Sequence, residues 1–298
     1  MNILVTGASG MIGSALTPFL TSRGHHVVKL VRSGARPDIR SAHWDPAAGK
    51  IDLKGAGPLD AVVHLAGETI GSRWTAERKR RIRESRIQGT RLLCEALGRL
   101  SQRPRTLISA SAVGFYGDRG EEWLEEESGA GQGYLAELSG DWEAATATAT
   151  RSGIRVVHLR FGIVLAPRGG ALAKMLPAFK WGLGGKLGGG GHYWSWIAID
   201  DVLGAIQHIL KAGTLNGPVN AVSPNPVSNL EFTRTLGRVL RRPTVFAVPR
   251  FALELLFGEM AREALLSSAR VKPAKLLADG FEFLFPELEP ALRHLLDR

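Results

Sequence analysis

A glycine-rich turn directly after the first apolar segment constrains the fold of this chain most. Residues 3–5 read Ile-Leu-Val, and residues 6–13 read TGASGMIG. Three glycines at this spacing, between a strand and a helix, let the backbone bend sharply, approach a pyrophosphate closely and pack helix on strand. The free amides at the start of the helix then hold the anion. We therefore expect the phosphates of a dinucleotide to bind at Gly7, Gly10, Met11, Ile12 and Gly13.

Short apolar runs alternate with helical patterns through the rest of the amino half. Strands are expected at residues 27–31, 61–65, 106–110 and 155–159, and helices at 11–22 and from about residue 134 to 150. Residues 42–53 contain Trp-Asp-Pro and a glycine, which indicates a short hairpin or turn. This alternation predicts an α/β fold, namely a Rossmann-type doubly wound parallel sheet.

The sequence changes character after residue 222, where prolines interrupt helical stretches such as 251–266. We expect residues 1–222 to form the Rossmann domain, with a glycine-rich insertion near 166–193, and residues 223–298 to form a smaller carboxyl-terminal lobe that contributes to the substrate pocket. Residues 182–191, GLGGKLGGGG, fit no regular structure and are either a linker or a loop over a ligand. Strands are expected at residues 194–197 and, from the alternation of Phe281, Phe283 and Phe285, before the last helix.

The end of the second strand determines which dinucleotide would bind. An acidic residue there hydrogen-bonds the ribose of NAD. Residues 29–36 read KLVRSGAR and contain no acid. Arg32 is placed to pair with a 2′-phosphate through two hydrogen bonds, with Ser33 beside it and Arg36 as a weaker second candidate. The residues therefore favour NADP, although Arg32 could also be a solvated arginine.

Three further stretches resemble the extended short-chain dehydrogenase/reductase superfamily: DAVVHLAG at 60–67, SASAVGFYG at 109–117 and WIAIDD at 196–201. The LAGE (65–68), DWE (141–143) and RFGIVL (160–165) stretches are similar to its epimerase-like subfamily, and the resemblance covers nearly the whole chain. It implies that Ser111 polarises a substrate carbonyl and that Arg160 reaches the cofactor or substrate. Ser111 could otherwise be a packing residue, with Ser109 as the second candidate. The resemblance also implies that the cofactor is lined by Leu65, Ala66, Gly67 and Glu68.

The chain departs from the YxxxK pattern of that superfamily. Residues 134–138 read YLAEL, so Tyr134 is present and Leu138 replaces the lysine. A tyrosine at its reference pKa of about 10 is ionised in roughly one molecule per thousand at neutral pH. Base catalysis by Tyr134 would then need another cation. Two functions follow: an NADP-dependent oxidoreductase or epimerase acting on a small polar carbonyl or hydroxyl, for which a nucleotide sugar is one candidate, or a non-catalytic NADP-binding sensor or scaffold, for example in cell division.

The formal charge of +10 would suit an anionic partner, so nucleic acid must be considered. The densest basic cluster, residues 78–86, shares its segment with Ile82, Gly89 and Leu93 at helical spacing. The arginines are therefore expected mostly on the solvated side of an amphipathic helix. With no nucleic-acid-binding motif in support, nucleic acid is not an expected partner.

Cysteine and histidine usage excludes several chemistries. Cys94 is the single cysteine, so disulfides and a zinc cluster are not expected, and no histidine pair has the spacing of a metal site. We expect His64 to be structural, and Asp200 and Asp201 to cap the following helix.

No run approaches the ~18 apolar residues of a membrane span, and the first residues already read as a strand rather than a signal peptide. We expect a cytoplasmic protein without a membrane partner, either a monomer or a homodimer.

Overall fold

The computed structural model describes residues 1–32 and 41–298. Its centre is an eight-stranded sheet in the order β13-β8-β6-β5-β1-β2-β3-β4. All neighbouring strands are parallel except the hairpin of β3 and β4. The chain winds outward from β1 in both directions, which confirms the doubly wound Rossmann prediction and the hairpin. The strands are β1 Asn2–Thr6, β2 His26–Arg32, β3 Ser41–Asp45, β4 Lys50–Asp52, β5 Ala61–His64, β6 Thr106–Ala112, β8 Arg155–Phe161 and β13 Gly217–Ala221.

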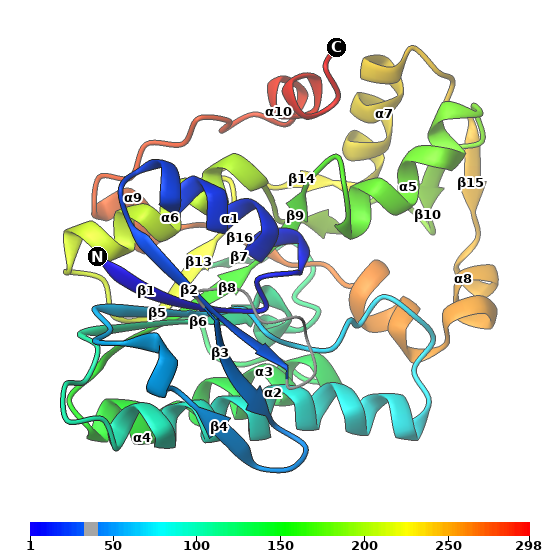
Figure 1. Cartoon of the computed structure of the whole chain (residues 1–298). Helices are drawn as coiled ribbons and strands as arrows, with labels where there is room; N and C mark the ends of the chain where they lie inside the picture. Colours follow the sequence, from blue (N-terminus) through cyan, green and yellow to red (C-terminus); the bar gives the residue numbers. More distant parts are fainter. Residues whose placement is uncertain (33–40) are drawn as a thin grey trace.

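Helices cover both faces of this sheet (Figure 1). One face carries α1 (Met11–Ser22) and α6 (Ile199–Ala212), and the other carries α2 (Ala76–Gly98), α3 (Tyr134–Ala144) and α4 (Ala147–Arg151). The single helix expected from 134 to 150 is thus two helices in succession.

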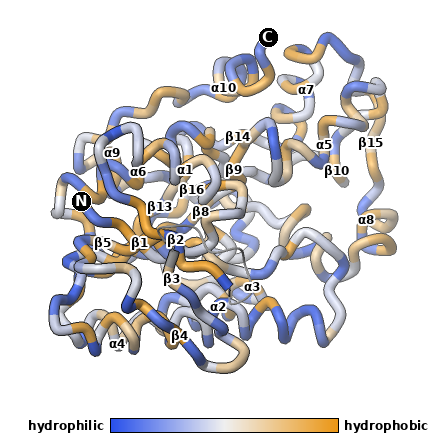
Figure 2. The backbone as a smooth tube through the Cα atoms, viewed as in Figure 1, coloured by the Kyte–Doolittle hydropathy of each residue, from blue (hydrophilic) through white to orange (hydrophobic). Residues whose placement is uncertain are grey.

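The central strands are apolar on both faces because both faces are covered. Ile3 and Val5 belong to the core on the α1 side, Leu4 belongs to the core on the α2 side, and all three are fully buried. Figure 2 shows that the central strands are mostly hydrophobic, whereas many of the outer segments are hydrophilic.

A second group of elements packs beside the sheet, with α5, β10, β15 and α8 at the right of Figure 1. The glycine-rich segment contributes α5 and β10 to it, and β10 pairs with β15 from the carboxyl-terminal region. The glycine-rich insertion and the carboxyl-terminal region are therefore joined in space. The expected domain boundary at residue 222 stays a prediction. These elements are β9 Ile163–Leu165, α5 Gly170–Lys180, β10 Gly185–Leu187, β11 Tyr193–Trp194, β12 Trp196–Ala198, β14 Val227–Ser228, α7 Asn229–Leu240, β15 Phe246–Val248 and α8 Arg250–Phe257.

The remaining elements of the described residues are short: the strands β7 Trp123–Leu124 and β16 Arg270–Val271, the helices α9 Ala274–Ala278 and α10 Leu288–Leu295, the 3-10 helices η1 Lys54–Ala56 and η2 Val113–Tyr116, and the π-helix η3 Ala261–Leu265.

Three local expectations were wrong. Residues 182–191 contain β10, because a glycine at 185 lets the backbone approach Phe246; an added Cβ would lie 2.1 Å from the carbonyl oxygen of Phe246. Residues 194–197 are divided between β11 and β12, which pair with different strands. Residues 281–285 do not form a strand: the amides of Leu284 and Phe285 donate to the Asp201 carboxylate instead of to a neighbouring strand.

The last of these contacts also corrects the expected capping role of Asp200 and Asp201. Both lie in the first turn of α6, and neither side chain caps the helix. Asp201 is buried and holds the carboxyl-terminal segment, while Asp200 lies 3.4 Å from His294.

Candidate dinucleotide site

The glycine turn joins β1 to α1 with almost no space for side chains. Gly7 has φ +67°, and a Cβ there would lie 2.8 Å from the backbone of Leu65. A Cβ on Gly13 would lie 2.2 Å from the carbonyl oxygen of Gly7. Gly10 is the exposed residue before α1, and no side chain caps that helix. The backbone amides of Met11 and Ile12 in the first turn of α1 therefore face a surface that an anion could occupy.

Thr6 connects this turn to the loop after β5. Its hydroxyl accepts hydrogen bonds from the amides of Leu65 (3.1 Å) and Ala66 (3.2 Å) and lies 2.7 Å from Nδ1 of His64. The other ring nitrogen of His64 lies 3.0 Å from the hydroxyl of Thr90. Burial lowers the pKa of His64 to about 4, so the ring is neutral at pH 7. The structural role expected for His64 is confirmed, whereas the role of Thr6 was not recognised from the sequence.

Two arginines of α2 fix the loop formed by residues 65–68. Arg86 donates to the carbonyl oxygen of Glu68 (2.9 Å), and Arg78 forms an ion pair with its carboxylate (2.8 Å). Burial lowers the pKa of the Arg86 guanidinium to about 10. The expectation that the arginines lie on the solvated side of the helix is therefore confirmed for Arg80, Arg81 and Arg83, which are exposed. It does not hold for Arg78 and Arg86. The signal that was missed is the helical spacing. Arg78 and Arg86 each lie four residues from the buried Ile82, so the three residues share one face of the helix.

Arg32 is exposed at the carboxyl end of β2. It lies two residues beyond Leu30, whose partner across the sheet is Thr6 at the start of the glycine turn. The arginine and the turn thus occupy the same edge of neighbouring parallel strands. Ser33 and Arg36 lie outside the described residues.

The glycine-rich insertion also contacts this edge. A Cβ on Gly169 would lie 3.3 Å from Cγ of Met11, and one on Gly170 would lie 2.7 Å from its sulfur. Farther along α5, the ammonium group of Lys174 donates to the carbonyl oxygen of Gly71 (2.9 Å). The start of α5 therefore lies beside the turn, and its body reaches the loop after β5.

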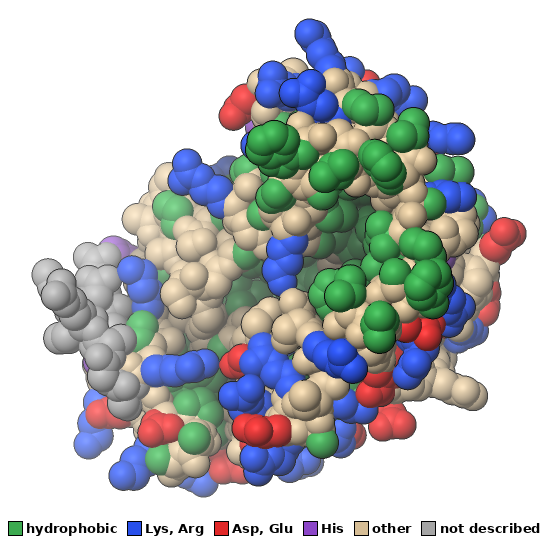
Figure 3. Space-filling model, turned by 90° about the vertical axis from the view of Figure 1, so that its right-hand side faces the viewer, with side chains coloured by type: hydrophobic (Ala, Val, Ile, Leu, Met, Phe, Trp, Pro, Cys, Tyr) green, Lys and Arg blue, Asp and Glu red, His purple; other side chains and the backbone are tan. Residues whose placement is uncertain are grey.

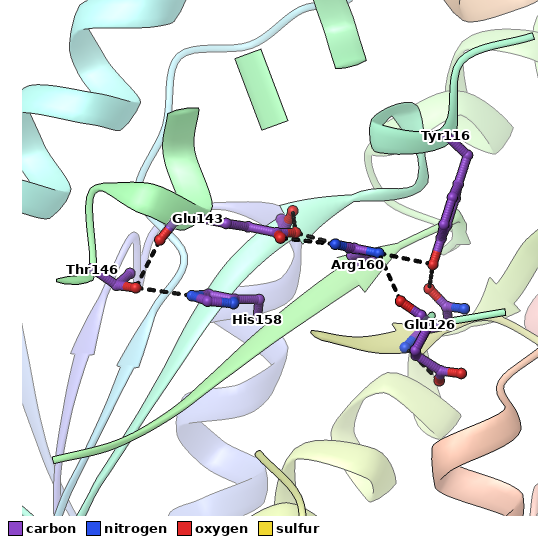
Figure 4. Close-up of polar contacts among 8 residues, drawn as sticks. Tyr116, Glu126, Glu143, Thr146, His158 and Arg160 are labelled. Atoms are coloured by element: carbon purple, nitrogen blue, oxygen red, sulfur yellow. Dashed lines mark hydrogen bonds and ion pairs between the residues drawn. The ribbon is translucent and has the colours of Figure 1, made fainter. Parts of the chain in front are cut away.

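Ser111 and Arg160 meet in a buried polar network. Ser111 is 3% exposed and donates to Oε1 of Glu143 (2.6 Å). Arg160, also 3% exposed, forms two hydrogen bonds with the Glu143 carboxylate (2.8 and 2.9 Å) and donates to the hydroxyl of Tyr116 (3.0 Å). Figure 4 shows Arg160 between Glu143 and Tyr116. The polar atoms of Ser111 and Arg160 are thus engaged by protein partners. The neighbouring Ser109 is buried, and its hydroxyl has no partner among the described residues.

Tyr134 lies in a different environment, between α2 and the carboxyl-terminal region. Its hydroxyl donates to the backbone carbonyl of Lys79 (2.7 Å), and its ring is 5.2 Å from that of Trp74. Leu138 is buried in the same apolar cluster, together with Met260. A lysine at 138 would place an ammonium group among these apolar side chains, which gives a physical reason for the leucine. The hydroxyls of Ser111 and Tyr134 are not brought to a common partner.

Cys94 is fully buried, and burial raises the pKa of its thiol to about 12, so this cysteine is a packing residue rather than a reactive one. Among residues 1–32 and 41–298, no cluster of His, Cys, Asp and Glu could hold a metal ion. In the same part of the chain, no helix is long and apolar enough to cross a membrane.

Comparison with known protein families shows to which family the chain with this site belongs. The model of the NAD dependent epimerase/dehydratase family matches residues 3–221. The chain belongs to this family. A second model, described as a domain of unknown function (DUF1731), matches residues 248–295 of this epimerase-family protein. The resemblance seen in the sequence is thereby confirmed.

Individual relatives align over the whole length. The epimerase family protein MT2273 of Mycobacterium tuberculosis is 42% identical over 297 residues, covering 99% of this chain and 98% of the relative. A crystal structure of human epimerase family protein SDR39U1 (isoform 2) with NADPH superposes with a TM-score of 0.91 at 34% identity, covering 100% of this chain and 99% of the human one. UDP-glucose 4-epimerase of Thermus thermophilus, in complex with NAD, shares the fold at a TM-score of 0.79 and 22% identity, over 100% and 98% of the two chains.

Proposed function

We propose that this epimerase-family protein binds NADP and acts as an oxidoreductase or epimerase on a carbonyl or hydroxyl group of a small polar molecule such as a nucleotide sugar. The observation that carries the proposal is the cradle formed by Gly7, Gly10 and Gly13, in which a Cβ on Gly7 or Gly13 would collide with backbone atoms. Such a turn before an uncapped helix suits a pyrophosphate, which would lie against the amides of Met11 and Ile12. The human relative SDR39U1 was crystallised with NADPH.

The preference for NADP over NAD rests on the end of β2. Arg32 is exposed there and, together with Ser33, would hold the 2′-phosphate by charge-assisted hydrogen bonds. No acidic residue occurs at positions 29–36 to bind a free ribose hydroxyl in its place. Residues 65–68 would line the cofactor, because Thr6 and Arg86 hold that loop against the turn.

Bound NADP would supply hydride transfer, and the chain itself must orient the substrate and handle its proton. We retain Ser111 and Tyr134 as the candidate groups for that proton. Both hydroxyls donate to protein acceptors, Glu143 and the carbonyl of Lys79, so each must exchange its partner for substrate during turnover. Arg160 would act indirectly, by holding Glu143 in place, rather than by touching the cofactor.

The second candidate function is a non-catalytic NADP-binding sensor or scaffold. It is favoured by the burial of Leu138 where the superfamily carries its lysine, and by the engagement of the Tyr134 hydroxyl. In that case the glycine cradle would bind the dinucleotide without turnover, and the carboxyl-terminal lobe would contact a partner.

Fluorescence titration with NADPH and NADH tests the cofactor proposal. We expect NADPH to bind at least about tenfold more tightly, since one charge-assisted pair provides at least ~1.4 kcal/mol. Arg32→Asp should reverse the preference, whereas Arg81→Asp, at an exposed arginine of α2, should leave it unchanged. Equal affinities for the two cofactors would remove the phosphate role of Arg32.

Turnover distinguishes the two functions. NADPH oxidation and NADP reduction would be followed against a panel of nucleotide sugars and small carbonyls. Turnover that is diminished more by Ser111→Ala than by Tyr134→Phe supports the enzyme and Ser111 as the polarising hydroxyl. Tight NADPH binding with no turnover on any member of the panel would support the sensor or scaffold instead.

A further inference from the structure

Seven large apolar side chains are exposed on the side of the molecule formed by α5, β15 and α8. They are between 50% and 82% exposed, with Trp181 at the upper limit. Figure 3 looks onto this side and shows hydrophobic side chains gathered around a hollow, with lysines and arginines among them. Soluble monomers rarely expose so many large apolar groups together, so this surface calls for an occupant. We call it the apolar face, consisting of Trp181, Leu183, Val245, Phe246, Phe251, Leu255 and Leu256.

The segments that carry the apolar face touch one another. Gly185 of β10, just after Leu183, pairs with Phe246 of β15. The guanidinium of Arg242 donates to the carbonyl oxygen of Lys180 (2.9 Å), which directly precedes Trp181. Trp181, Leu183, Val245 and Phe246 therefore lie on one built surface, and α8, which carries the other three residues, follows β15 directly in the chain.

Two stretches around this face are strongly basic, whereas α8 also carries Glu254, which pairs with Arg250. Residues 166–199 and 232–253 contain no aspartate or glutamate. An open depression at the end of α7 is lined by four arginines, two of which continue into the connection to β15. Within the described residues, Lys180 and Arg241 have no acidic partner within 4 Å, whereas Arg238 pairs with Glu289 and Arg250 pairs with Glu254. The basic residues of the two segments are Arg168, Lys174, Lys180, Lys186, Arg234, Arg238, Arg241, Arg242 and Arg250.

We infer that the apolar face docks on the surface of an anionic phospholipid membrane. Exposed tryptophan and phenylalanine side chains insert at the boundary between headgroups and acyl chains, and each nearby Lys or Arg adds attraction to anionic headgroups. Such peripheral binding needs no spanning segment. The sequence-based expectation of no membrane partner rested on the absence of a long apolar run, and this inference departs from that expectation.

Two other occupants fit the surface less well. Nucleic acid would use the arginines and stack on aromatic rings, but it would leave Val245, Leu255 and Leu256 exposed to water. A second copy related by a two-fold axis would place the basic segments against identical basic segments, which costs electrostatic repulsion. A lipid surface satisfies both the apolar and the basic residues.

Vesicle co-sedimentation tests the inference with the whole 298-residue chain. We expect binding to phosphatidylcholine vesicles that contain about 30% phosphatidylglycerol, little binding to pure phosphatidylcholine vesicles, and weaker binding at high salt. Trp181→Ser/Phe251→Ser and Lys180→Glu/Arg234→Glu should each reduce the bound fraction at least about tenfold. The matched controls are Leu284→Ser, at a leucine that is 69% exposed outside the face, and Arg81→Glu on α2; both should bind like the original protein.

Several results would overturn the inference: no binding to anionic vesicles, equal binding to neutral ones, or undiminished binding by the face variants. A dimer in sedimentation velocity that Trp181→Ser/Phe251→Ser converts to a monomer, without any vesicle binding, would make the face a subunit interface. Duplex DNA binding without vesicle binding would make it a nucleic-acid surface. Unchanged NADPH affinity of the variants verifies their fold, and Arg32→Asp should leave vesicle binding intact, so this inference stands or fails independently of the proposed function.

Discussion

The phenolic hydroxyl of Tyr134 donates a 2.7 Å hydrogen bond to the backbone carbonyl of Lys79. The ammonium group of Lys79 in turn lies 4.4 Å from the centre of the tyrosine ring and pairs with Glu259. Glu263 accepts hydrogen bonds from the amides of Tyr134 and Leu135 at the start of α3. These contacts join α2, α3 and the carboxyl-terminal region, so Tyr134 has a clear structural role in addition to its proposed catalytic one.

Tyr134→Phe should therefore lower stability modestly and change turnover by less than about tenfold. The loss of one hydrogen bond costs about 1 kcal/mol, while the ring keeps its apolar contacts. Burial also raises the pKa of the Tyr134 hydroxyl, so the phenolate that base catalysis needs is scarce at pH 7. Urea unfolding and steady-state NADPH oxidation measure the two effects. A hundredfold loss of rate at unchanged stability would show that Tyr134 handles the substrate proton.

Gly13→Ala should abolish dinucleotide binding and destabilise the protein. The new Cβ would lie 2.2 Å from the carbonyl oxygen of Gly7, a contact that only movement of the turn can relieve. The matched control is Gly140→Ala in α3, where a Cβ meets nothing within 4 Å and helix propensity favours alanine by up to about 1 kcal/mol. NADPH titration and thermal unfolding of both variants provide the test. Normal NADPH affinity in folded Gly13→Ala would mean that the cradle has been placed wrongly.

Asp201→Ala should release the segment that follows residue 280. The carboxylate accepts hydrogen bonds from the amides of Leu284 (2.7 Å) and Phe285 (3.1 Å), and both amides would lose their partner. Two such bonds to a charged group contribute about 3–6 kcal/mol, although burial of that charge offsets part of the gain. Hydrogen exchange of residues 281–288 should become faster, and stability should fall. Asp200→Ala, at the partly exposed neighbour, should change neither; equal effects of the two variants would contradict the assigned contact.

Acid should destabilise the protein through His64. Burial lowers its pKa to about 4 in the folded chain, whereas the unfolded chain binds this proton below about 6.5. The unfolded state thus gains a proton first, and the free energy of unfolding falls as pH decreases from about 6.5 to 4, by up to about 3 kcal/mol. His64→Asn should be less stable at pH 7 and have a shallower acid dependence. Urea unfolding between pH 7 and 4.5 measures both slopes, with His294→Gln, at a half-exposed histidine, as the control. Parallel curves for the original protein and His64→Asn would contradict the assignment.

The sequence alone was sufficient for features whose cause is local. The continuous apolar run of residues 3–5 requires a strand covered on both faces, and it is covered by α1 on one side and α2 on the other. Gly7 is needed because its φ of +67° lies in the left-handed region, and Gly13 is needed because a Cβ there would meet the carbonyl oxygen of Gly7. Since these constraints act between residues close in sequence, the Rossmann order and the cradle were predictable.

Features that depend on distant partners needed the tertiary structure. Asp201 has the sequence context of a helix cap, yet its carboxylate binds amides more than 80 residues away. The alternating phenylalanines at 281–285 resemble a strand, but no neighbouring strand among the described residues pairs with them. Ser111 lies near the carboxyl end of β6, where a catalytic serine would stand, and only the arrangement in space shows that Glu143 accepts its hydrogen bond.

The apolar face illustrates the same division. Phe251, Leu255 and Leu256 of α8 have an apolar pattern that the sequence cannot distinguish from that of a core helix such as α6. Hydrophobic periodicity records which side of a helix avoids water, but the element that covers that side is set by long-range packing. The sequence therefore determined the fold and the dinucleotide cradle of this protein. Only the tertiary structure decided which charged side chains are buried as positioning groups and which apolar side chains are left exposed for a partner.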